Sequence, residues 1–95
     1  GMAGYLIFYY VLEEGEIARI ATAHSVRRQG AASQMFRKLL DFCREQKITR
    51  IILEVRENNE AARQFYGKCG FTKDGIRRNY YENPKENAVL MSVNL

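Results

Sequence analysis

The chain has 95 residues, of which 46% are hydrophobic, and 15 lysine and arginine residues against 11 acidic ones give a formal net charge of +4. This length fits one small domain, which we expect to span residues 2–95, with Gly1 a remnant of tag removal before Met2. The basic residues are scattered along the chain, so the charge does not indicate a nucleic-acid partner. An anionic ligand would suit this mild positive bias.

Neither a membrane segment nor a metal site is predicted. No apolar run approaches the roughly 18 residues that a membrane span needs, and the chain does not start with a secretion signal. Cys43 and Cys69 have no CxxC spacing and no cluster of histidines near them, so neither a zinc site nor a disulfide framework is indicated. We expect a cytoplasmic protein without a metal.

The first part of the chain is predicted to form two antiparallel strands. Residues 5–12 are aromatic and branched aliphatic, with no charged residue among them. This is typical of a strand that is buried on both faces or packed against another chain. Residues 13–15 are expected to turn the chain. Residues 16–23 alternate imperfectly between apolar and polar, which predicts a second strand.

A helix is predicted next, over residues 31–46, because apolar residues recur at steps of three and four: Ala32, Met35, Phe36, Leu39, Leu40 and Cys43. A continuous β-branched run at 48–55 follows. Strand, helix and strand are therefore expected to form a right-handed βαβ unit with parallel strands.

The remainder is predicted to hold one more helix and two more strands. An asparagine at 58–60 can cap a helix that runs to about Lys68 and ends at Gly70. Residues 71–81 and 88–94 read as strands, and Pro84 lies in the loop between them. The expected order is β-β-α-β-α-β-β in a single α/β domain with a mixed sheet.

One segment between a predicted strand and a predicted helix could bind an anion. Backbone amides at a helix N-terminus have no partner within the helix and attract negative charge. Gly30 would let the backbone approach a pyrophosphate closely, and its neighbours are small, basic or hydroxylated. Taken alone, the segment is more typical of an ordinary helix start. Its residues are Arg27, Arg28, Gln29, Gly30, Ala31, Ala32 and Ser33.

The order of three motifs resembles a known family. RxxGxA after a strand, ILEV at the end of the next strand and then NxxAxxFYxxxGF are similar to the pattern of GNAT acetyltransferases. LEVRENNEAARQFYGKCGF followed by IRRNYY resembles, more narrowly, the ribosomal-protein alanine N-acetyltransferases, which acetylate a protein N-terminus. The resemblance covers residues 5–95 and implies the GNAT fold, without its N-terminal part.

The resemblance implies acetyl-coenzyme A as co-substrate and assigns its contacts. The backbone of Ile20, Ala21 and Thr22 would pair with the pantetheine arm as an added strand does. The segment around Gly30 would hold the pyrophosphate, and Asn59 would hydrogen-bond the cofactor beyond its sulfur.

The reaction requires a base for the amine and an acid for the departing thiolate. Glu54 ends a buried run, where desolvation makes a carboxylate a stronger base, and it matches the base of the resembled subfamily. Tyr66 matches the acid of the family. From the residues alone, Glu54 reads as an exposed carboxylate paired with Arg56, and Tyr66 as a core aromatic.

The same resemblance places Arg78, Asn79 and Tyr80, together with Arg77 and Tyr81, along the strands that grip the acceptor. A solvated basic strand edge is an equally good interpretation. The acceptor would be a protein N-terminus. Two alternatives stay open: a small-molecule amine as acceptor, or a coenzyme-binding or regulatory module with little turnover.

The chain departs from the family at its start. Family members begin with a strand, two helices and another strand ahead of the matched segment, whereas this chain starts at about their third strand. The aromatic strand at 5–12 would then have an open edge and exposed apolar surface. We therefore expect a homodimer, or an exchange of strands, through this edge.

Overall fold

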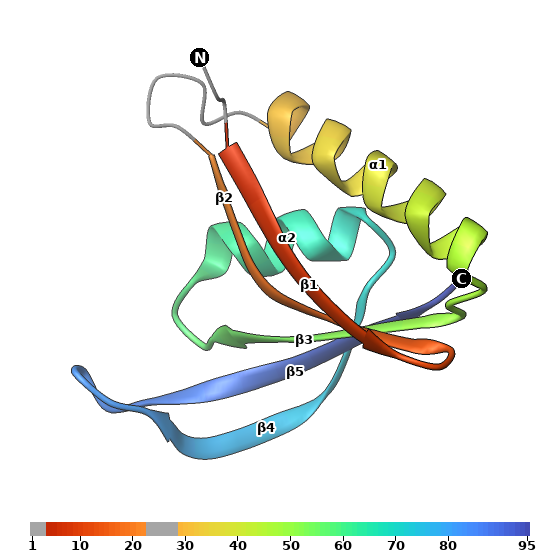
Figure 1. Cartoon of the computed structure of the whole chain (residues 1–95). Helices are drawn as coiled ribbons and strands as arrows, with labels where there is room; N and C mark the ends of the chain where they lie inside the picture. The colour runs from red at the N-terminus through yellow and green to blue at the C-terminus, as the bar shows by residue number, and fades with distance from the viewer. Residues whose placement is uncertain (1–3, 23–28) are drawn as a thin grey trace.

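The computed structural model describes residues 4–22 and 29–95, which form one five-stranded mixed sheet and two helices (Figure 1). The strand order in the sheet is β1-β2-β3-β5-β4. The predicted chain order is confirmed, and the elements are β1 (Gly4–Val11), β2 (Glu14–Thr22), α1 (Gln29–Gln46), β3 (Arg50–Arg56), α2 (Glu60–Lys68), β4 (Thr72–Tyr81) and β5 (Glu86–Asn94).

Strands β2 and β3 are parallel and are joined through α1, as the sequence predicts, while the other neighbouring pairs are antiparallel. Several predicted boundaries differ from the structure by one or two residues, and two of them involve glycines that matter below. The first turn consists of Leu12 and Glu13, so Gly15 lies inside β2, where a Cβ would overlap the ring of Phe8. Helix α1 begins at Gln29, which places Gly30 in its first turn.

Both helices contribute to a single core on one face of the sheet. Burial alternates along β3, and Ile51, Leu53 and Val55 face this core. They pack with side chains from α1 and from α2 and its end, which include Phe36, Leu39, Cys43, Tyr66 and Phe71. The other side chains of β3, among them Glu54, therefore point to the face of the sheet that neither helix covers.

Strand β1 lies at an edge of the sheet and is not buried on both faces, so of the two expectations for it only packing against another chain stays a prediction. Tyr9 is 64% exposed and Val11 is 76% exposed. On the helix side, the rings of Phe8 and Tyr10 contact Phe42 of α1. The opposite side of β1 is exposed, because no helix of the described residues covers it. None of these helices is long and apolar enough to cross a membrane.

We expect the exposed edge of β1 to pair with a second copy of the chain, because an unpaired edge beside apolar side chains favours strand addition. Sedimentation at tens of micromolar should show a dimer. Ile7→Lys, which places a charge on the bare side of β1, should give a monomer. A monomer of the unsubstituted chain at that concentration would refute the expectation.

Candidate functional site

Strands β2 and β3 separate midway along their length. Their ladder joins Glu14–Ile17 only with Arg50–Leu53, although β2 continues to Thr22 and β3 to Arg56. Figure 1 shows the two strands diverging beyond this point. The register between β1 and β2 shifts here, since Phe8 pairs with Ile17 and Ile7 with Arg19, which leaves Ala18 as an extra residue. Such a β-bulge bends the strand that carries it.

The separation leaves one edge of β2 without a partner strand. Residues 20–22 pair with β1 on one side, and β3 does not reach them on the other. Their backbone groups on that side are available to an extended ligand. These are Ile20, Ala21 and Thr22, the residues for which a backbone role is predicted.

A pocket of about 320 Å³ lies where the strands part. It draws side chains from β2, β3, α2 and β4, and brings three predicted site residues together: Glu54, Asn59 and Tyr66. The rest of its lining consists of Ile17, Ala18, Val55, Arg56, Ala62 and Tyr81. Of these six residues, the sequence places only Tyr81 near a ligand. Arg56 could have been found, because it follows Glu54 by two residues and so shares its face of β3.

Glu54 is in the pocket wall with one oxygen buried. Its side chain is 22% exposed, and Oε1 is 3.7 Å from Nη1 of Arg77 on β4. Oε2 is buried and has no hydrogen-bond donor among the described residues. The expected alternative, a pair with Arg56, is wrong, since Arg56 instead pairs with Glu86.

Tyr66 is both a core residue and part of the pocket. It is 5% exposed, and its ring packs edge-on against Phe65 and Phe71. Burial raises the pKa of Tyr66 to about 12, and the nearby Cys69 adds to the shift. The hydroxyl therefore keeps its proton at neutral pH.

Asn59 caps helix α2, as predicted. Its Oδ1 accepts a hydrogen bond from the backbone N–H of Ala62 at 3.1 Å. This bond fixes the side chain of Asn59 at the pocket. Because Oδ1 is already occupied, the amide nitrogen is the group that could donate a hydrogen bond to a ligand.

The predicted anion-binding segment lies partly outside the described residues, which do not include Arg27 and Arg28. The described part forms the first turn of α1, which contains no acidic residue. Among the described residues, nothing lies within 4 Å of a Cβ built at Gly30. The first amides of the helix have no partner within the helix, and Ala32 and Ser33 are half-buried behind them.

The predicted acceptor residues Arg78, Asn79 and Tyr80 are exposed on β4, where the register with β5 shifts between Arg77 and Tyr81. Asn79 has a φ of 53°, and its N–H donates to Oδ1 of Asn87 at 2.8 Å. The guanidinium of Arg77 lies 4.9 Å from the centroid of the Tyr80 ring. Tyr81, and not Tyr80, reaches the pocket.

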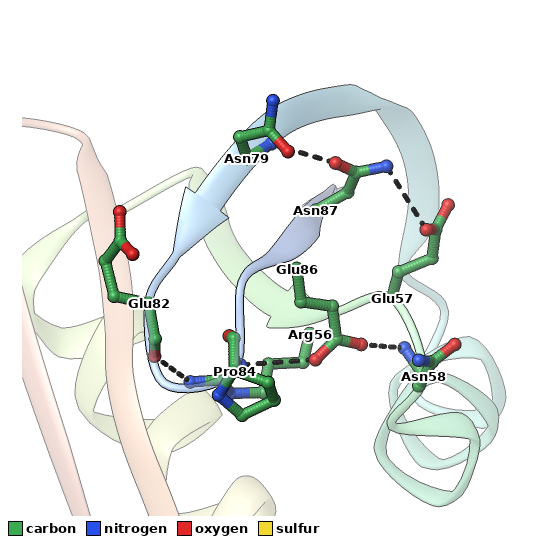
Figure 2. A network of polar contacts seen from close by, with 8 residues as sticks. All are labelled: Arg56, Glu57, Asn58, Asn79, Glu82, Pro84, Glu86 and Asn87. Carbon is green, nitrogen blue, oxygen red and sulfur yellow. Dashed lines mark hydrogen bonds and ion pairs between the residues drawn. The ribbon is translucent and has the colours of Figure 1, made fainter.

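Arg56 joins the pocket wall to the β4–β5 hairpin (Figure 2). Its guanidinium donates to Oε1 of Glu86 at 3.2 Å and to the backbone carbonyls of Pro84 and Glu82. It also lies 4.3 Å from the centroid of the Tyr81 ring.

The second oxygen of Glu86 accepts from the backbone N–H of Asn58, next to the cap of α2. A parallel contact runs from Asn87 to Glu57, as Figure 2 shows. The network therefore ties the hairpin of β4 and β5 to the loop between β3 and α2.

We predict that Glu86→Gln lowers the free energy of unfolding by about 1–3 kcal/mol, because it weakens bonds to a guanidinium and to a backbone amide. The side chain of Glu86 is only 11% exposed, so water compensates poorly. Urea unfolding at neutral pH measures the change. Glu82→Gln is the matched control, since only the backbone of Glu82 accepts from Arg56. Equal losses in the two variants would contradict the prediction.

The chain matches a known protein family. Residues 1–71 match the sequence model of the "Acetyltransferase (GNAT) family". The chain is similar to the ribosomal protein bS18-alanine N-acetyltransferase of Haemophilus influenzae, with 37% identity over 95 residues, which cover 97% of this chain and 64% of that protein.

Solved structures agree with this match. The ribosomal-protein-S18-alanine N-acetyltransferase of Escherichia coli superposes with a TM-score of 0.88 at 34% identity, over 98% of this chain and 61% of that one. Arabidopsis thaliana Naa50, solved with the bisubstrate analogue CoA-Ac-MVNAL, has a TM-score of 0.87 at 26% identity, over 98% and 66% of the two chains. The chain thus spans somewhat less than two thirds of the length of these ribosomal-protein alanine N-acetyltransferases.

Proposed function

Because the chain belongs to the acetyltransferase (GNAT) family, we propose that it transfers an acetyl group from acetyl-coenzyme A to the amino terminus of a protein. The similar proteins of Haemophilus influenzae and Escherichia coli are named for acetylating an alanine of a ribosomal protein. The observation that carries the proposal is the pocket between β2 and β3, which holds Glu54, Asn59 and Tyr66 together.

The co-substrate would enter along the parted strands. Backbone groups of residues 20–22 would pair with the amides of the pantetheine arm, as a neighbouring strand would. The free amides at the start of α1 would accept the diphosphate, and Arg27 and Arg28 would add positive charge. The open space around Gly30 supports this placement.

The acceptor and the co-substrate would approach from opposite faces of the sheet. Glu54 belongs to the face of β3 that neither helix covers, whereas Tyr66 belongs to α2 on the other face. Both reach the same pocket because the strands have parted there. An amine arriving over the open face would therefore meet the thioester inside the gap.

In the proposed reaction, Glu54 accepts a proton from the acceptor amine, whose nitrogen then attacks the thioester carbonyl. The tetrahedral intermediate collapses, the carbon–sulfur bond breaks, and an amide is formed. Tyr66 donates its proton to the departing sulfur, and the second proton that the nitrogen loses as the amide forms restores the phenol. Burial raises the pKa of Tyr66 to about 12, which leaves the hydroxyl protonated near pH 7 but also makes it a weaker acid.

The acceptor peptide would lie beside β4. Arg78, Asn79 and Tyr80 are exposed at the register shift next to the pocket, where side chains and unpaired backbone are accessible. Tyr81 forms the adjoining wall.

We predict that Glu54→Gln lowers kcat by at least about 100-fold, because the amide cannot accept the proton, while coenzyme binding stays intact. Thiol release from acetyl-coenzyme A measures turnover, and calorimetry measures binding. The acceptors are peptides that copy ribosomal-protein N-termini, compared with polyamines and aminoglycosides. Full activity of the variant would sink the assignment of the base.

The acceptor series also separates the alternatives. Turnover with peptides supports the proposal, and turnover with polyamines or aminoglycosides alone indicates a small-molecule acetyltransferase. Binding of the coenzyme without turnover of any acceptor would indicate a coenzyme-binding module.

Gly30→Asp should weaken coenzyme binding at least about tenfold, because a carboxylate in the first turn of α1 repels the diphosphate. Calorimetry with acetyl-coenzyme A measures the loss. The fold should be retained, since the added side chain meets open space and an acidic residue suits a helix start. Gly30→Asn is the uncharged control and should bind more tightly than Gly30→Asp. Unchanged heats in Gly30→Asp would remove the diphosphate from this site.

A further inference from the structure

We infer that Arg77 is a positioning residue, which holds the carboxylate of Glu54 in its orientation in the pocket. The inference rests on the proposed role of Glu54 as the base. It adds Arg77 of β4 to the residues that act on the proposed base. The sequence predicts a contact of Arg77 with the acceptor only.

The register of three strands brings the two side chains together. Arg56 of β3, Ala88 of β5 and Arg77 of β4 lie in one row across the sheet, and Glu54 lies in the next row, opposite Leu90. Arg77 must therefore cross β5 to reach Glu54. It can do so because the intervening residue, Ala88, carries only a methyl group.

Ala88 is completely buried although it lies on the face that neither helix covers. Longer side chains beside it must cover it. The 3.7 Å separation between Nη1 of Arg77 and Oε1 of Glu54 shows that the guanidinium does extend over β5.

A second arginine is closer to Glu54 along the chain but is occupied elsewhere. Arg56 follows Glu54 by two residues and shares its face of β3. Its guanidinium is directed to the hairpin by Glu86 and by the carbonyls of Pro84 and Glu82, as Figure 2 shows. Arg77 is then the cation that faces Glu54, and the ring of Tyr80 under its guanidinium limits its movement.

The contact has a physical consequence for the base. Oε2 of Glu54 is buried without a hydrogen-bond donor among the described residues. The positive charge of Arg77 attracts Oε1 from the other side. At 3.7 Å the contact is longer than a hydrogen bond, so it can orient the carboxylate without occupying an oxygen lone pair.

The test compares Arg77→Met with Arg77→Lys and with the unsubstituted chain, by following thiol release at one fixed pH. We expect kcat to fall about 10- to 100-fold in Arg77→Met, as for a displaced catalytic group, with the KM for acetyl-coenzyme A changed less than about threefold. Arg77→Lys should restore part of the rate, since it keeps the charge but not the planar contact with Tyr80.

Arg44→Met is the matched control. Arg44 is exposed on α1 and pairs with Asp41, so its replacement removes the same charge far from the pocket. Its kcat should equal that of the unsubstituted chain. Equal losses of kcat in Arg44→Met and Arg77→Met would overturn the inference, because they would reflect net charge alone.

A measurement without turnover separates this inference from the proposed function. The ¹³C shift of the Glu54 side-chain carboxyl, measured at one fixed pH, should change in Arg77→Met and stay the same in Arg44→Met. If the unsubstituted chain acetylates nothing, the proposed function fails, while this shift still tests the contact. An unchanged shift in Arg77→Met would overturn the inference even in an active enzyme.

Discussion

The separation of β2 from β3 is the constraint on which the rest of the site depends. Four residues of each strand are paired, and the bulge at Ala18 then turns β2 away. Parallel strands that stayed paired would satisfy each other's backbone groups and leave no room between them. Parting them produces both a free strand edge and a pocket, at the cost of a few ladder hydrogen bonds.

The two faces of the sheet differ, and the pocket connects them. One face carries α1, α2 and the core, which holds Tyr66 in place through aromatic packing. The other face carries charged side chains that are held by one another: Arg56 by Glu86, and Glu54 by Arg77. The proposed acid and the proposed base therefore have different surroundings, one apolar and one with a nearby cation.

The hairpin of β4 and β5 links the acceptor side to the pocket. Glu86 bonds to Arg56 and to the backbone next to Asn59, so the hairpin, the end of β3 and the start of α2 form one connected unit. The segment proposed to meet the acceptor emerges from this unit at a register shift. Rigid support of an exposed loop by paired strands is a common arrangement for recognition.

The sequence by itself determined the order of the elements, the cap at Asn59, the end of α2 at Gly70 and the type of residue at each site position. These features depend on local periodicity and on short-range hydrogen bonds, which neighbouring residues control. Only the tertiary structure decided that β1 is exposed, that Ala18 forms the bulge, and that Arg77 rather than Arg56 faces Glu54. Each of these depends on which strands become neighbours and in what register, and strand register arises from contacts between residues that are distant in the chain.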